Sequence, residues 1–242
     1  MIWIIGGTAE TREIIDRIKD MDNYIVTSAT DSEKEFIPCP NLVVGRMDYV
    51  SMTDFIDENH ISLIVDLSHP YAAEVTENAK RAAQSRSIKY VRYVRSKVEF
   101  EGMGTYLRGY EECLDFLKGI KGTVFFTTGS KNIGDFEKVR NKNRFIYRIL
   151  PAPESIEECR KHEIRMKDIV AVLGPFSKKF NKAMFAEYDV DYVVMKDSGR
   201  EGGTIEKIQA CGELGIIPII IGRRDEEGIY DIDEIENIIR MV

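Results

Sequence analysis

The sequence lacks the long apolar runs that mark membrane-spanning and secreted proteins. No apolar stretch approaches the roughly 20 residues that a membrane helix needs, so no transmembrane segment is expected. The chain starts Met-Ile-Trp-Ile-Ile-Gly-Gly, without the basic residues and the longer apolar stretch of a secretion signal. We therefore expect a soluble, cytoplasmic protein.

Cysteine and histidine are few and scattered. The four cysteines form no Cys-x-x-Cys pair, and the three histidines lie far apart in the chain. Zinc sites usually draw their ligands from closely spaced pairs, and disulfide frameworks belong to secreted domains. We expect reduced cysteines and no bound metal.

Positive charge is in deficit, with 34 Lys and Arg against 41 Asp and Glu and a formal net charge of -7. A general binder of nucleic acid or anionic membranes would carry a net basic field. No nucleic-acid or membrane partner is therefore expected, although a local basic pocket is compatible with this balance. The length of 242 residues suits one large domain or two small ones.

Short apolar runs alternate with segments of helical period along the whole chain. Several runs are apolar at consecutive positions, as strands of a parallel sheet covered on both faces are. This alternation predicts βαβ units and an α/β fold. The predicted strands are 1–5, 24–29, 42–45, 63–67, 89–94, 123–127, 145–150, 169–173, 192–195 and 216–221, and the predicted helices include 8–20, 71–85, 178–188, 204–214 and 232–241.

The alternation of strands and helices restarts after a Gly-containing stretch at 98–106, so a domain break is expected near residue 100. Residues 4–10 and 126–131 are similar, since each is a buried strand, a Gly turn, a hydroxyl residue and the start of a helix. We predict two Rossmann-like domains with mainly parallel sheets, at residues 1–100 and 101–242.

Gly6, Gly7 and Thr8 follow the first predicted strand. Ligands of open α/β sheets bind beyond the carboxyl ends of the strands, and a Gly turn at a helix start suits a phosphate. The alternative is a tight turn in which Thr8 only caps the helix.

Ser68, His69 and Tyr71 follow the fourth predicted strand, around Pro70. Polar residues on such a loop favour contact with a substrate or cofactor. The alternative is a capped helix start with a solvated histidine.

The second half offers further polar residues after its strands. Thr128, Gly129 and Ser130 form a second Gly-hydroxyl turn. A Gly-rich segment with Lys and Arg follows strand 192–195 and suits a bound anion, with a mobile solvated loop as the alternative. The residues predicted to bind substrate are Ser68, His69, Arg148, Ser177, Lys196, Ser198, Gly199, Arg200, Gly202, Gly203 and Lys207.

Two common signatures are missing and a third is discounted. The chain has no Gly-x-x-x-x-Gly-Lys-Ser/Thr and no Gly-x-Ser-x-Gly. Tyr93 with Lys97, and Tyr192 with Lys196, match Tyr-x-x-x-Lys. That catalytic pair needs a helical turn, whereas in a strand the two residues are about 13 Å apart.

Seven motifs, in this order, make the chain resemble the precorrin-6A reductase family. They are Gly6-Gly7-Thr8-Ala9-Glu10, Asp66-Leu67-Ser68-His69-Pro70-Tyr71-Ala72, Tyr90-Val91-Arg92-Tyr93, Thr127-Thr128-Gly129-Ser130-Lys131, Arg148-Ile149-Leu150-Pro151, Gly174-Pro175-Phe176-Ser177, and Lys196-Asp197-Ser198-Gly199 with Gly202-Gly203. The resemblance covers about residues 1 to 224. The chain departs from the family pattern at Ser68 and Met195, where the family often has Thr, and at Arg224, where it usually has Pro.

The resemblance implies an enzyme of cobalamin synthesis that reduces a double bond of the corrin macrocycle with NADH or NADPH, on two Rossmann-like domains with the ligands in the cleft between them. The pyrophosphate is expected at Gly6–Thr8, at Thr128–Ser130 or at both. The proton donor is open between a bound water and four side chains, and five cations are candidates to bind substrate carboxylates. The four candidate donors are His69, Tyr71, Lys196 and Ser198, and the five cations are Arg148, Lys196, Arg200, Lys207 and Arg223.

Acidic residues at 31 and 33, beyond the second strand, favour NADH. The same acidic, Arg-free segment favours the cobalt-containing route. Two other hypotheses stay open at this point. One is a ligand-binding protein without catalytic activity, and the other is an NAD-dependent reductase or epimerase of sugar nucleotides. The oligomeric state is open as well.

Overall fold

The computed structural model describes residues 1–29, 39–96, 104–199, 202–223 and 225–242. The chain forms two compact units. Unit 1 consists of Met1–Arg95 and Asp225–Val242, and unit 2 is Ser96–Arg224. In the described residues, no helix has both the length and the apolar character to cross a membrane.

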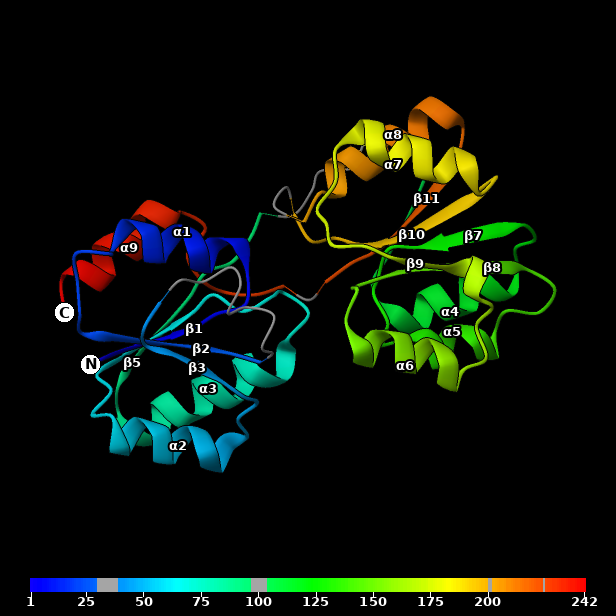
Figure 1. Cartoon of the computed structure of the whole chain (residues 1–242). Helices are drawn as coiled ribbons and strands as arrows, with labels where there is room; N and C mark the ends of the chain where they lie inside the picture. The colour runs from blue at the N-terminus through cyan, green and yellow to red at the C-terminus, as the bar shows by residue number, and fades with distance from the viewer. Residues whose placement is uncertain (30–38, 97–103, 200–201, 224) are drawn as a thin grey trace. The chain divides into compact units, whose positions relative to one another are not determined.

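Unit 1 contains a five-stranded parallel sheet with the order β3-β2-β1-β4-β5. Its strands are β1 (Ile2–Ile5), β2 (Tyr24–Ser28), β3 (Leu42–Val44), β4 (Leu63–Asp66) and β5 (Lys89–Arg92). Helices α1 (Ala9–Arg17) and α9 (Ile232–Arg240) cover one face, and α2 (Tyr49–Glu58) and α3 (Ala73–Arg86) cover the other (Figure 1).

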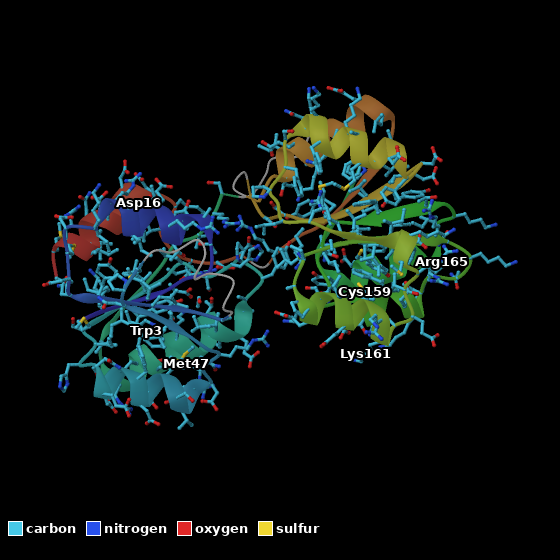
Figure 2. The ribbon with its side chains drawn as sticks, viewed as in Figure 1. Trp3, Asp16, Met47, Cys159, Lys161 and Arg165 are labelled. Carbon is cyan, nitrogen blue, oxygen red and sulfur yellow. The ribbon has the colours of Figure 1, made fainter. Side chains whose placement is uncertain are left out.

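Both faces of this sheet are buried, as the consecutive apolar positions predicted. Ile2 and Ile4 of β1 pack in the core against α1 and α9, and Trp3 packs in the core against α2 and α3. Figure 2 shows Trp3 at the sheet, with the exposed Asp16 on the outer side of α1. Successive side chains of a strand point to opposite faces, so one four-residue strand contributes to two cores.

Unit 2 contains a six-stranded parallel sheet with the order β6-β11-β10-β7-β8-β9. Its strands are β6 (Thr105–Leu107), β7 (Thr123–Phe126), β8 (Arg144–Ile149), β9 (Ile169–Ala171), β10 (Tyr192–Lys196) and β11 (Ile217–Ile221). Helices α7 (Lys178–Glu187) and α8 (Thr204–Leu214) lie on one face. Helices α4 (Tyr110–Lys118), α5 (Ile133–Lys138) and α6 (Pro153–Lys161) lie on the other (Figure 1), with the buried Cys159 on α6 (Figure 2).

The two sheets share one plan. The order β3-β2-β1-β4-β5 of unit 1 corresponds to β9-β8-β7-β10-β11 of unit 2, and β6 is added at the edge. In both sheets the strand order reverses next to the first strand of this plan, between β1 and β4 and between β7 and β10. The predicted likeness of residues 4–10 and 126–131 is confirmed, because β1 and β7 occupy equivalent places.

The predicted α/β fold is confirmed, and each of the ten predicted strands overlaps a strand of the structure. Tyr192 and Lys196 are the two ends of β10, so this Tyr-x-x-x-Lys match lies in a strand as predicted. Strand β6 was not predicted, since it begins within the stretch 98–106 that was interpreted as a domain break. Helices α2, α4, α5 and α6 were also not singled out.

The C-terminal segment belongs to unit 1, not to the second domain as predicted. Ile235 and Ile239 of α9 are buried in the same core as Ile14 and Ile18 of α1. The chain returning from unit 2 pairs beside β5, where the amide of Val94 donates to the Ile229 carbonyl at 2.8 Å. The amphipathic pattern predicted the helix but carried no information about which sheet it covers.

Gly228 allows this close approach of the returning chain. A Cβ at position 228 would clash with the carbonyl oxygen of Arg92 and lie 2.7 Å from a methyl carbon of Val94. We expect Gly228→Ala to lower the free energy of unfolding of unit 1 by about 1–3 kcal/mol. Trp3, the only tryptophan of the chain, is buried in unit 1, so its fluorescence in a urea titration measures the effect.

Gly212→Ala is the matched control. It lies in α8 of unit 2, where an added Cβ meets no heavy atom within 4 Å, so the Trp3 transition should not move. A wild-type urea midpoint for Gly228→Ala would show that the contact does not constrain the backbone.

Candidate functional site

The carboxyl ends of the parallel strands bring two sets of polar residues to the points where the strand order reverses. Such points are where open α/β sheets bind ligands. In unit 1 the turn after β1 meets the loop after β4. In unit 2 the turn after β7 lies next to the segment after β10.

The Gly6-Gly7-Thr8 turn of unit 1 is both a helix cap and an open backbone surface. The Thr8 hydroxyl donates to the Leu67 carbonyl at 2.9 Å, and the Thr8 backbone amide donates to the Thr11 hydroxyl at 3.3 Å. Gly7 has a φ of +106°, and a Cβ there would meet no heavy atom within 4 Å. Thr8 therefore caps α1 and ties the two loops together, while Gly7 leaves room for a ligand beside the helix start.

A buried polar network fixes the loop after β4. Asp66 accepts hydrogen bonds from the amide of Ser68 at 2.9 Å, from Arg92 Nη1 at 3.0 Å and from the Tyr90 hydroxyl at 2.8 Å. Arg92 also donates through Nε to Glu226 at 3.0 Å and through Nη1 to the Ser68 carbonyl at 2.8 Å. The guanidinium of Arg92 thus links Asp66, Ser68 and Glu226, and Tyr90 joins the network through Asp66.

The electrostatics of this network keep Arg92 charged and Tyr90 neutral. Burial acts to lower the pKa of Arg92, but the charges of Asp66 and Glu226 outweigh it and the pKa is raised. Burial, together with the charge of Asp66, raises the pKa of Tyr90. At neutral pH the network therefore contains one guanidinium charge between two carboxylates, with a neutral tyrosine hydroxyl.

His69 and Tyr71 are held against each other on the same loop. The Nδ1 of His69 accepts a hydrogen bond from the amide of Tyr71 at 3.2 Å, and the two rings lie 5.7 Å apart. Because Nδ1 is the acceptor, the neutral imidazole carries its proton on Nε2. His69 is therefore positioned by its backbone neighbour, not only solvated at a helix start.

A second buried ion pair stands at the first turn of α1. Arg95 Nε and Nη2 donate to the two carboxylate oxygens of Glu10 at 2.5 and 2.8 Å. Burial acts to raise the pKa of Glu10, but the hydrogen bond and charge of Arg95 lower it overall. Both buried arginines of unit 1 thus face carboxylates.

The turn after β7 in unit 2 resembles the first turn in geometry. Gly129 has a φ of +80° and open space at its Cβ position. The Ser130 hydroxyl donates to Ser155 at 3.2 Å, which commits it to α6. The buried Thr128 Oγ1 has no hydrogen-bond partner in the part of the chain that the structure describes. An orphaned buried hydroxyl at a strand end suits contact with a ligand.

Three cations converge beside this turn. Arg148 lies on β8 and Lys196 ends β10, the two strands that flank β7, while Lys207 lies on α8. Arg148 donates to Asn181 Oδ1 at 2.8 Å, and its guanidinium carbon lies 5.1 Å from the centroid of the Phe176 ring. We call Arg148, Lys196 and Lys207 the cation cluster.

The pKa values of the cluster are depressed. Burial lowers the pKa of Arg148 to about 10. Burial and the charge of Lys131 lower the pKa of Lys196 to about 8. Burial, with the charges of Arg148 and Lys196, lowers the pKa of Lys207 to about 7. A bound anion would offset each of these effects.

The described part of the segment after β10 is buried and hydrogen-bonded, not a mobile solvated loop. Asp197 is fully buried and accepts a hydrogen bond from the Tyr106 hydroxyl at 3.1 Å. Burial and the charge of Asp197 raise the pKa of Tyr106 to about 12. The Ser198 amide donates to the Thr204 hydroxyl at 3.2 Å, and the Gly199 carbonyl accepts from the Thr204 amide at 3.4 Å.

The remaining predicted residues have mixed outcomes. The carbonyl of Gly202 accepts from Lys207, and Gly203 precedes α8. Ser177 caps α7 by accepting from the Phe180 amide at 3.3 Å. Arg223 is buried after β11. Arg200 and the acidic residues at 31 and 33 lie outside the described residues.

Sequence reasoning missed the network partners. Arg92 and Glu226 are 134 positions apart and lie in segments that the prediction assigned to different domains. Glu10 and Arg95 are 85 positions apart. A basic residue ending a strand and an acidic residue in a first helical turn are too common to signal such pairs.

The fold defines a Rossmann-like α/β protein with polar residues gathered at the strand ends of both units. The family model described as "Precorrin-6x reductase CbiJ/CobK" matches residues 1–241. The chain belongs to this precorrin-6x reductase family.

Curated relatives span nearly the whole chain. The chain is 35% identical over 232 residues to a cobalt-precorrin-6A reductase of Priestia megaterium, covering 92% of this chain and 90% of that protein. It is 32% identical to one from Methanothermobacter thermautotrophicus, covering 93% and 76%. A solved structure described as CobK precorrin-6A reductase has a TM-score of 0.79 at 19% identity, covering 99% of this chain and 96% of that one, and so supports the fold.

The buried network around Arg92 yields a stability prediction. Arg92→Met would leave the carboxylates of Asp66 and Glu226 without their cation, so we expect the free energy of unfolding of unit 1 to fall by about 3–5 kcal/mol. Trp3 fluorescence in urea measures the loss.

Arg86→Met is the control, because Arg86 makes an ion pair with Asp57 at 2.7 Å on the surface of the same unit. Exposed ion pairs contribute little, so its transition should stay close to that of the wild type. Equal effects of the two substitutions would contradict the distinction between the two pairs.

Proposed function

We propose that this protein reduces cobalt-precorrin-6A with a reduced nicotinamide dinucleotide, and that the cation cluster of unit 2 binds carboxylates of the macrocycle. The observation that carries the proposal is the cation cluster of a precorrin-6x reductase family member with a net charge of -7. Corrin precursors bear acetate and propionate groups, and Arg and Lys match such carboxylates.

The dinucleotide pyrophosphate is assigned to the Gly6-Gly7-Thr8 turn. The open space at Gly7 and the start of α1 fit a phosphate bound through backbone amides. The neighbouring buried arginines already face Asp66, Glu226 and Glu10, so this turn offers amides and hydroxyls, not unpaired charge. Unit 2, by contrast, is left for the ligand with several carboxylates.

When bound, a reduced nicotinamide supplies a hydride to one carbon of a ring double bond, so that the neighbouring carbon needs a proton and the nicotinamide leaves oxidised. Lys196 is the candidate side chain best suited to hold that proton. Its pKa of about 8 lies near neutral pH, where a general acid is most effective. Arg148 and Lys207 would bind carboxylates, and the His69 loop would border the dinucleotide.

The activity is tested by anaerobic incubation with cobalt-precorrin-6A and either NADH or NADPH. We expect the absorbance of the reduced nicotinamide to fall together with a change in the macrocycle spectrum, in equal molar amounts. Comparison of the two nicotinamides determines the cofactor preference. If neither the nicotinamide absorbance nor the macrocycle spectrum changes with NADH or with NADPH, the proposed function is refuted.

Lys196→Met tests the proton donor, with an expected loss in kcat of about 100-fold to 10,000-fold. In the wild type, kcat should fall as pH rises through the pKa of Lys196 in the substrate complex, because the acid must be protonated. The bound carboxylates place this pKa at or above its value of about 8 in the free protein. Lys131→Met removes a positive charge that lowers the pKa of Lys196. It should therefore move this fall in kcat to higher pH at low ionic strength. If the pH at which kcat falls stays the same or moves lower in Lys131→Met, Lys196 is excluded as the donor.

A further inference from the structure

Lys207 is the most deeply buried cation of the cluster. The residue is 5% exposed, and its Nζ donates a hydrogen bond to the carbonyl of Gly202 at 3.2 Å. A carbonyl dipole is a weak partner for a buried ammonium group, which usually requires a carboxylate or another anion.

The groups facing Lys207 come from three elements. Arg148 of β8 and Lys196 of β10 are positive, Glu206 on α8 is negative, and Cys211 on α8 has a pKa raised to about 12 and is neutral. On α7, Lys178 and Lys182 each form an ion pair with Glu213 at 2.7 Å. The charge of Glu206 does not compensate burial and the two cations among the described residues, since the pKa of Lys207 falls to about 7.

The structure around the cluster indicates what would complete it. Strand β7 lies between β8 and β10, so the turn carrying Thr128 lies between the strands that carry Arg148 and Lys196. The buried Thr128 hydroxyl lacks a partner in the described chain, and a carboxylate oxygen could accept its hydrogen bond. Cations and an orphaned donor from neighbouring strand ends thus suit one anionic group.

We propose that Lys207 takes up a proton when a carboxylate of the tetrapyrrole enters the cation cluster, so that the protein selects its substrate by negative charge and binds it together with a proton. The identity of the ligand rests on the proposed function, whereas the proton uptake rests on the cluster itself. Lys207 is a positioning residue for the carboxylate and takes no part in hydride transfer.

The consequence is a binding affinity that falls with rising pH. Above pH 7 the free protein holds Lys207 largely neutral, and the incoming anion must bring a proton with it. The dissociation constant should then rise about tenfold for each pH unit for each proton taken up. Carboxylates of the substrate are ionised throughout this range and add no slope of their own.

The experiment titrates cobalt-precorrin-6A into the protein without nicotinamide and follows the macrocycle spectrum from about pH 6 to about pH 9. Calorimetry at pH 7.5 in two buffers of different ionisation enthalpy counts the protons directly in the wild type. We expect net uptake, and a dissociation constant that rises across the range. A pH-independent constant with no uptake would overturn the proposal.

Two variants separate charge from structure. Lys207→Arg keeps a permanent charge, so it should bind the macrocycle and lose the part of the uptake due to this residue. Lys207→Met should bind at least tenfold more weakly, with no such uptake, while its unfolding midpoint rises because a poorly compensated buried amine is gone. Unchanged uptake in both variants would assign the proton elsewhere and overturn the proposal.

NADP⁺ as the titrant distinguishes the source of the anion. Binding of NADP⁺ should change little in Lys207→Met, because the dinucleotide is assigned to unit 1. A Lys207-dependent uptake with NADP⁺ and none with the macrocycle would overturn the proposed occupant. Failure of the turnover assay with uptake of protons intact would instead refute the proposed function alone.

Discussion

Parallel strand pairing is the constraint on which the rest of this structure depends. Because all strands of a sheet run the same way, their carboxyl ends and the loops that follow lie along one edge. In each unit the strand order reverses beside the central strand, between β1 and β4 in unit 1 and between β7 and β10 in unit 2. The loops that follow these two strands therefore meet. This places Gly7 beside the loop of His69, and Thr128 between strands that end near Arg148 and Lys196. Neither group of residues is close in sequence, and neither needs special loop geometry to be brought together.

The same plan carries opposite electrostatics in the two units. At the edge of unit 1, Arg92 lies between Asp66 and Glu226, and Arg95 faces Glu10. Removing either arginine leaves a buried carboxylate uncompensated, so these pairs hold the loops in place. In unit 2, the charges of Arg148 and Lys196 repel that of Lys207, and Lys207 is held by a backbone carbonyl. Paired charges stabilise a framework, whereas like charges brought together at a strand end favour an anion from outside the chain.

The sequence predicted those features that depend on local pattern. Short apolar runs predicted ten of the strands, and strand geometry correctly placed Tyr192 and Lys196 at the two ends of β10. Strand-end position singled out Thr128, Arg148 and Lys196 as candidates, and Lys207 was added from the helix that follows; their roles stay predictions. It could not place α9, because an amphipathic helix packs as well on one α/β sheet as on another. It also could not find the partners of Arg92, since contacts 134 residues apart leave no periodicity in the chain.

The contrast between Arg92 and Lys207 shows why the two kinds of buried cation use different side chains. The guanidinium of Arg92 stays charged and spreads its donors over Asp66, Ser68 and Glu226, which suits a fixed role. The amine of Lys207 can lose its charge when no anion is near, because its proton is held weakly at neutral pH. An arginine in that place would keep three like charges together in the empty site at all times. A lysine lowers this cost in the free protein and becomes fully charged when a ligand makes the charge favourable.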